Sequence, residues 1–180
     1  MIHVICFAGG TCGDLITALI DPTGIEVKGS RIWLSEDRCR LKKPHLFPDR
    51  ESKNLYLEQM TLIYKSLPSH DFDYHKGQKF IGITVEDFGT AHQAATRFKN
   101  LHRPHVWQEM QNLCGAKTVE DYAQILIDFS RLIKSHAHLV IGLEDIVSGR
   151  AIEVLSNLGI VTDNRAKSLY QHWLSAQTEG

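Results

Sequence analysis

The part of the chain that decides the fold reads Ile2-His3-Val4-Ile5-Cys6-Phe7-Ala8-Gly9-Gly10-Thr11-Cys12-Gly13-Asp14-Leu15-Ile16-Thr17-Ala18-Leu19-Ile20. Residues 2–7 are apolar and rich in β-branched side chains, so they predict a buried strand. Three glycines follow within residues 9–13, and the apolar residues 15–20 then predict a short helix. A buried first strand that leads into a helix is typical of a parallel sheet covered by helices on both faces. This opening therefore predicts an α/β fold.

Strands and helices alternate along the rest of the chain. Further strands are expected at residues 25–27, 31–34, 79–85 and 138–143. Further helices are expected at residues 49–66, 90–101 and 118–134, in a helix from Ser148 to Asn157, and in a last helix capped by Thr162. Thr118 and Asp121 have the spacing of a capping box. Because no repeat or linker interrupts the 180 residues, we expect a single domain over residues 1–180.

Composition and charge exclude several classes of protein. The formal net charge is −1, and the basic residues 38–43 lack interleaved aromatic side chains, so nucleic acid is disfavoured as a partner. No apolar run approaches the roughly 20 residues that cross a membrane, and the first residues lack the basic region of a signal peptide. The four cysteines have no metal-binding spacing, which is typical of reduced thiols. We therefore expect a cytoplasmic protein that spans no membrane.

The glycine loop, residues 9–13, is the first candidate site. Glycines between a strand and a helix let backbone N–H groups approach an anion at the positive end of the helix dipole. We therefore expect Gly9, Gly10, Thr11, Cys12 and Gly13 to hold a phosphate or sulfate, with the Thr11 hydroxyl as a further donor. The alternative is a tight turn that packs without a ligand. If the loop binds a nucleotide, Gly10→Val is expected to abolish binding and to leave the fold largely intact.

Known phosphate-binding loops match this stretch only in part. Residues 2–27 contain no lysine, which disfavours the Walker A loop of an ordinary ATPase or kinase. Residues 8–13 keep the last two glycines of the dinucleotide-binding fingerprint, and Glu26 follows sooner than that motif's acidic residue. Some nucleotide-sugar glycosyltransferases open with a Gly-Gly-Thr-Gly-Gly loop, whose first half is present here. A nucleotide-sugar glycosyltransferase therefore remains an alternative.

The order of segments resembles the P-loop-like sulfotransferases over most of the chain. Residues 7–12 are similar in position to the loop of that family that binds the 5′-phosphosulfate. Residues 67–71 resemble the segment with the family's histidine base, and residues 80–101 follow the family's order of central strand and helix. Residues 143–146, the helix after them and residues 158–160 resemble the C-terminal pattern of the family. The chain also resembles small proteins of cyanobacterial phages, which implies no activity.

The resemblance implies a P-loop-like three-layer fold with a central, mainly parallel sheet. It also implies a nucleotide-donor group transferase that moves a sulfuryl group from 3′-phosphoadenosine-5′-phosphosulfate to a hydroxyl acceptor. His70 would be the catalytic base. Ala8 replaces the family's loop lysine, and Val85 or Glu86 replaces its arginine for the 3′-phosphate. Arg97, one helix further on, is the residue that could supply this charge in space.

Each of these candidate residues has a structural alternative. His70 would otherwise cap a turn, and Arg97 with its basic neighbours Lys99, Arg103 and His105 would otherwise interact with a helix dipole. The ten histidines include His102-x-x-His105 and His136-x-His138, but neither pair has a carboxylate or cysteine cluster, so we expect no metal site. Trp107, Tyr170 and Trp173 are expected in the core. Ala8 favours the remaining alternative, a non-catalytic binding or structural protein on the same fold.

Overall fold

The computed structural model describes residues 3–20, 25–28, 31–34, 79–101 and 104–178 of the chain. The helix expected at residues 49–66, the basic residues 38–43 and the candidate base His70 lie outside these ranges. The strands are β1 (His3–Cys6), β2 (Ile25–Lys28), β3 (Arg31–Leu34), β4 (Lys79–Thr84) and β5 (Leu139–Gly142). The helices are α1 (Gly13–Ile20), α4 (Phe88–Leu101), α5 (Pro104–Cys114), α6 (Val119–His136), α7 (Leu143–Val147), α8 (Ala151–Asn157) and α9 (Asn164–Thr178).

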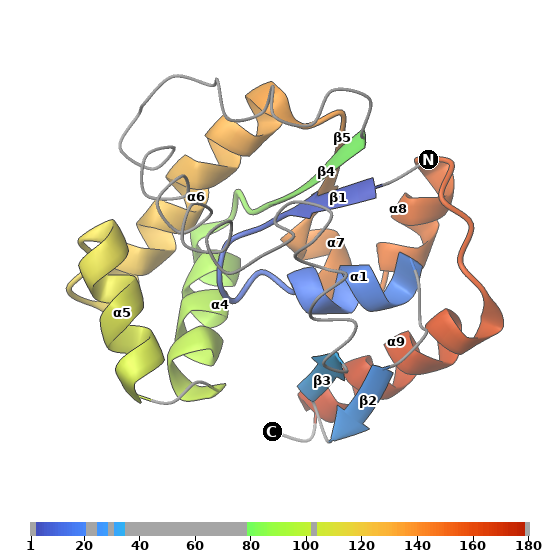
Figure 1. Ribbon diagram of the computed structural model, residues 1–180, viewed down its shortest axis with the longest axis horizontal. Coiled ribbons are helices and arrows are strands. Elements are labelled where there is room, and N and C mark those ends of the chain that lie inside the picture. The colour runs from blue at the N-terminus through green and yellow to red at the C-terminus, as the bar shows by residue number, and fades with distance from the viewer. Residues whose placement is uncertain (1–2, 21–24, 29–30, 35–78, 102–103, 179–180) are drawn as a thin grey trace.

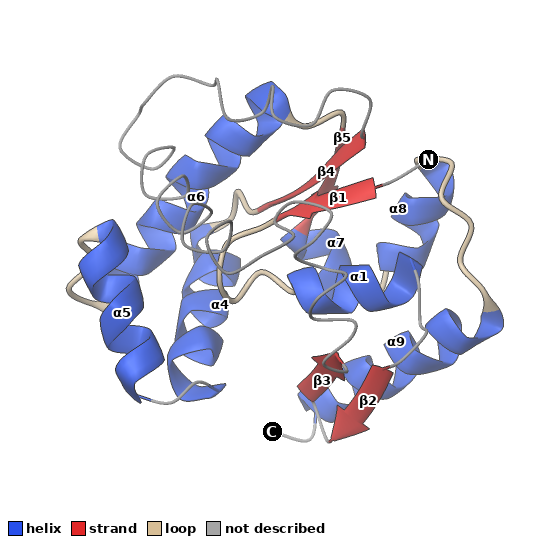
Figure 2. Cartoon of the chain, viewed as in Figure 1, coloured by secondary structure: helices blue, strands red, loops and turns tan. Residues whose placement is uncertain are grey.

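A parallel sheet of three strands, in the order β1-β4-β5, forms the centre of the described chain (Figures 1 and 2). Ile5 pairs with Ile81, and Ile83 pairs with Ile141. The strands β2 and β3 form a separate antiparallel pair, in which Val27 is opposite Ile32. The expected α/β class with a parallel sheet is therefore confirmed.

Helices cover the sheet on both faces. A Cβ on Gly82 would collide with Ile133 of α6, so this face of β4 lies directly against α6. Side chains alternate along a strand, so Ile81 and Ile83 point to the other face, and both are buried there. Figure 1 shows α4, α5 and α6 on one side of the sheet and α1, α7, α8 and α9 on the other.

The large aromatic side chains lie in the core, as expected. Trp107, Tyr170 and Trp173 are all buried. The planes of the Tyr170 and Trp173 rings are stacked, with their centroids 6.2 Å apart. The Tyr170 hydroxyl donates to the Ile146 carbonyl and accepts from the Ala151 N–H, so it joins α9 to α7 and α8.

Two helix starts differ from the prediction. The expected helix from Ser148 to Asn157 begins three residues later, as α8 at Ala151, and Ser148 is instead the C-cap of α7, a helix that the sequence did not predict; Gly149, with φ +90°, lies between the two helices. Asp163, not Thr162, caps α9, because its carboxylate accepts the Ala166 N–H at 2.8 Å. Aspartate is the stronger N-cap of the two residue types.

The starts of α6 and α5 can be compared with the helix-start signals in the sequence. The capping box of α6 is confirmed: Thr118 accepts the Asp121 N–H at 3.1 Å, and the Asp121 carboxylate accepts the Thr118 N–H at 3.0 Å. The helix α5 was not predicted, although Pro104 at its first position is a known start signal. Among the described helices, none is long and apolar enough to cross a membrane.

Candidate functional site

The glycine loop lies where β1 ends and α1 begins. In a parallel sheet all strands end at the same edge, so this loop shares its edge with the connections from β4 to α4 and from β5 to α7. Ligands of open α/β sheets bind outside this carboxyl edge. The structure therefore places Gly9, Gly10, Thr11, Cys12 and Gly13 at the edge where a ligand is expected.

Packing against α4 requires two of these residues to be glycine. A Cβ on Gly9 would lie 2.6 Å from the Phe98 ring, and a Cβ on Gly10 would lie 2.5 Å from the Ala94 carbonyl oxygen. Gly10 also has φ +90°, a conformation that side chains rarely adopt. The expectation that Gly10→Val leaves the fold largely intact is therefore wrong, because valine would be both strained and overpacked at this position.

Thr11 closes the loop on itself. Its side chain is only 2% exposed, and its hydroxyl donates to the Ala8 carbonyl at 2.7 Å. The Thr11 N–H is directed to the same carbonyl at 3.2 Å. The single hydroxyl proton is thus used inside the loop, rather than directed out of it as expected.

Cys12 connects the loop to α1. It has a left-handed backbone with φ 65°, and its carbonyl accepts the Ile16 N–H, the first bond of the helix. Burial raises the pKa of the Cys12 thiol, and the nearby positive charge of Arg97 lowers it by a smaller amount. The thiol is therefore protonated at neutral pH, and Cys12 is suited to packing rather than to nucleophilic chemistry.

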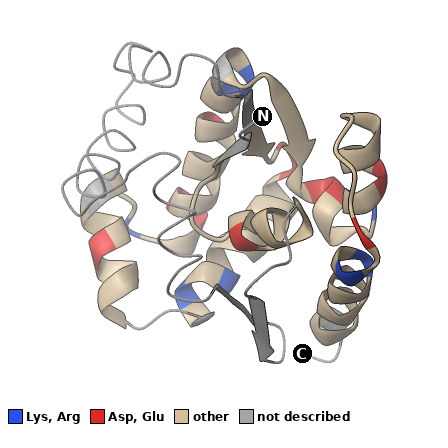
Figure 3. Ribbon diagram, turned by 45° about the vertical axis from the view of Figure 1, so that its right-hand side comes forward, with Lys and Arg blue, Asp and Glu red and all other residues tan. Residues whose placement is uncertain are grey.

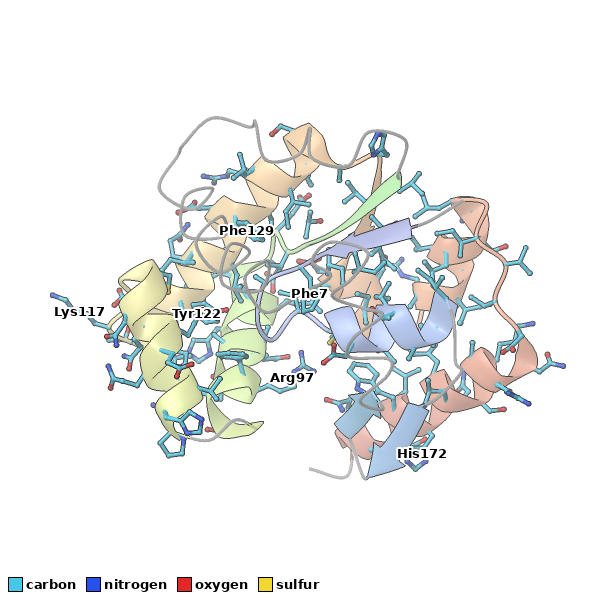
Figure 4. All side chains as sticks on the ribbon, viewed as in Figure 1. Phe7, Arg97, Lys117, Tyr122, Phe129 and His172 are labelled. Atoms are coloured by element: carbon cyan, nitrogen blue, oxygen red, sulfur yellow. The ribbon has the colours of Figure 1, made fainter. Side chains whose placement is uncertain are left out.

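Arg97 is the cation that the structure brings to this loop. Figure 4 shows Arg97 extending from α4 towards α1 and α9. Its guanidinium donates to the Gln177 side chain at 3.1 Å and lies 5.9 Å from the centre of the Trp173 ring, while its charge acts on Cys12. Arg97 therefore joins α4 to α9, and it lies next to Phe98, the residue of α4 that packs against Gly9 and Gly10. The sequence suggested Arg97 as a substitute for the 3′-phosphate cation that is absent at Val85 and Glu86, whereas the structure places Arg97 on the part of α4 that packs against the glycine loop.

Carboxylates occupy other positions at the same edge. Asp14 is in the first turn of α1, where a negative charge stabilises the helix dipole. Glu144 accepts the backbone N–H groups of Glu86 and Asp87, at 2.8 and 3.0 Å, in the connection from β4 to α4. Glu86 itself forms an ion pair with Lys134. The connection after β4 is therefore held by carboxylates, and the family's phosphate-binding arginine has no counterpart there.

Asp87 has a structural role in the same connection. Its carboxylate accepts the N–H and the hydroxyl of Thr90, at 2.7 and 3.0 Å, and these bonds lower the pKa of Asp87. Charged residues of both signs are distributed over several of the described helices, as Figure 3 shows. In the described part of the chain, no group of three or more His, Cys, Asp or Glu side chains could hold a metal ion.

The remaining candidate residues are not brought to the loop. Lys99 lies 5.9 Å from the centre of the Trp107 ring, and His105 is exposed on α5. Sequence reasoning missed one contact with the loop, a hydrogen bond from the Tyr122 hydroxyl to the Gly9 carbonyl at 3.0 Å. Periodicity had placed Tyr122 on the core face of α6, but the partner of its hydroxyl lies 113 positions away in the sequence.

Comparison with known proteins adds no relative to this description. The chain matches no protein-family model, no curated protein and no solved structure.

Proposed function

We propose that the glycine loop and Arg97 bind a phosphate group of a nucleotide, and that the chain is a group transferase of the sulfotransferase type. The observation that carries the proposal is the position of Arg97, which directly precedes Phe98 on the part of α4 that packs against Gly9 and Gly10 and extends towards α1. A helix N-terminus with a guanidinium beside it is a favourable place for a phosphate. The resemblance of segment order supports the same assignment.

The described residues fit one phosphate group. Arg97 supplies a planar cation, and the backbone at the start of α1 supplies the positive end of a helix dipole. Gln177 is an uncharged partner of Arg97, so a phosphate can compete for the guanidinium without breaking an ion pair with that residue. Asp14 opposes the phosphate by charge repulsion, which makes Arg97 more important to its binding.

Sulfuryl transfer is the chemistry that this arrangement would serve. The donor 3′-phosphoadenosine-5′-phosphosulfate would supply the sulfuryl group when bound. Arg97 and the loop would hold the phosphate and stabilise negative charge on it. His70 would take the proton from the hydroxyl acceptor. A three-layer P-loop-like arrangement is part of the same proposal, and the parallel sheet between α6 and α1 supports it.

A panel of nucleotides tests the proposed donor class. If the donor is that of the sulfotransferases, we expect adenosine 3′,5′-bisphosphate to bind more tightly than adenosine 5′-phosphate by about tenfold or more, because the 3′-phosphate would add one charge-assisted contact to those of the phosphate that Arg97 and the loop would hold. Isothermal titration calorimetry with both nucleotides, UDP and NAD gives the comparison. Equal affinity for the two adenosine nucleotides would contradict a sulfotransferase donor. Preference for UDP would favour the nucleotide-sugar glycosyltransferase instead.

A second candidate function, non-catalytic binding or a structural role, is favoured by the interior of the loop. Gly9 and Gly10 are required for contact with α4, and the Thr11 hydroxyl bonds to Ala8. Packing and hydrogen bonding within the protein thus explain why these residue types occur in the loop, without a ligand. If no nucleotide of the panel raises the melting temperature at millimolar concentration, this second function is the better account.

A further inference from the structure

Tyr122 holds the glycine loop from the side of α6. Its hydroxyl donates to the Gly9 carbonyl at 3.0 Å, and its side chain is 2% exposed. Figure 4 shows Tyr122 in the region between α6, α5 and α4. The hydrogen bond is part-buried, so water competes with it less than with a bond at the surface.

Neighbouring aromatic rings fix the direction of this hydroxyl. The Tyr122 ring centre lies 5.7 Å from that of Phe98 and 5.6 Å from that of Trp107, which meets it edge-on. Phe98 is also the residue that packs against Gly9 and Gly10. The ring that bonds to the loop and the ring that packs against it therefore belong to one cluster, Phe98, Trp107 and Tyr122.

The bond to Gly9 determines where the next N–H group points. In a trans peptide the carbonyl and the following N–H point in opposite directions, and no described peptide bond is cis. Because the Gly9 carbonyl faces Tyr122, the Gly10 N–H faces away from the aromatic cluster. The N–H and the hydroxyl of Thr11 both point to the Ala8 carbonyl. The Gly10 N–H is therefore the donor of the loop whose direction depends on the bond between Tyr122 and Gly9.

We infer that Tyr122 is a positioning residue, whose hydroxyl orders the glycine loop and directs the Gly10 N–H towards the bound phosphate. The part that concerns the phosphate rests on the proposed function. The ordering of the loop does not, because it follows from the contacts of Tyr122, Phe98 and Gly9 alone.

The test compares Tyr122→Phe with Tyr170→Phe. Tyr170 is a matched control, since it is equally buried and its hydroxyl also bonds to a backbone carbonyl, that of Ile146 rather than one of the loop. Each change removes one hydroxyl and keeps the ring. The measurements are hydrogen exchange of the Thr11 amide, the melting temperature, and the affinity for adenosine 3′,5′-bisphosphate by calorimetry.

We expect Tyr122→Phe to speed exchange of the Thr11 amide and to weaken nucleotide binding, each by about two- to tenfold, the net effect of one hydrogen bond. Tyr170→Phe is expected to lower the melting temperature without either change. Unchanged exchange and affinity in Tyr122→Phe, or equal changes in both variants, would overturn the inference. If the wild-type protein binds no nucleotide, the proposed function fails, and the exchange comparison still decides whether Tyr122 orders the loop.

Discussion

At the scale of single residues, Gly10 and Gly115 show two different reasons why a position requires glycine, a positive φ and close packing. Both have positive φ, 90° and 76°, but a Cβ on Gly10 meets the Ala94 carbonyl oxygen at 2.5 Å, whereas a Cβ on Gly115 meets nothing within 4 Å. Gly115→Ala should therefore cost only the backbone strain, about 1–2 kcal/mol. Gly10→Ala should cost about 1–3 kcal/mol more, because the loop must move away from α4. Urea denaturation of both variants measures the difference, and equal losses of stability would contradict the close packing of the loop.

The sequence predicted the positions of these residues better than their contacts. Glycines after an apolar strand indicated the loop, and helical spacing placed Arg97 one helix beyond β4. The sequence could not show that Gly9 and Gly10 are required by Phe98 and Ala94, because these residues lie on an element distant in the chain. The same limit hid the Tyr122 bond, since periodicity indicates which face is buried and not what a buried hydroxyl contacts.

At the scale of the elements, the start of α9 gives a direct test of capping. Asp163 accepts the Ala166 N–H at 2.8 Å, so Asp163→Ala should lower the free energy of unfolding by about 1 kcal/mol. Thr162→Ala removes the cap that the sequence had suggested and should have a much smaller effect. Thermal unfolding of the two variants distinguishes them, and a larger loss in Thr162→Ala would show that the helix begins differently.

The elements that sequence predicted correctly have strong local signals. Apolar β-branched runs located β1, β4 and β5, and the capping box located the start of α6. The prediction was wrong at Ser148, which was expected to begin a helix but is the C-cap of α7, and it missed α7 itself, a helix of only 5 residues directly after β5. It also missed α5, although Pro104 is a start signal and the apolar residues Val106, Trp107, Met110, Leu113 and Cys114 follow helical spacing.

At the scale of the whole molecule, the described cations at the carboxyl edge of the sheet differ in their partners: Lys134 is paired with Glu86 and Arg150 with Asp145, whereas Arg97 bonds to the uncharged Gln177. Arg97 extends from α4 towards α1, while Asp14 and Glu144 lie in the first turns of α1 and α7, and Glu86 lies in the connection from β4 to α4. A phosphate at the glycine loop would therefore depend on Arg97 more than in a site with several cations. The dependence of phosphate binding on Arg97 can be measured without knowledge of the acceptor.

The most direct measurement is the affinity of Arg97→Gln and Arg97→Lys for adenosine 3′,5′-bisphosphate by calorimetry, with melting temperatures recorded for both. Both variants lose the planar guanidinium that lies near Trp173, so they share most of the structural cost, but lysine keeps the charge. We predict that Arg97→Gln weakens binding by about tenfold or more, the effect of losing a charge-assisted contact, and that Arg97→Lys recovers part of it. Binding that is equal in the wild-type protein and in Arg97→Gln would contradict the account.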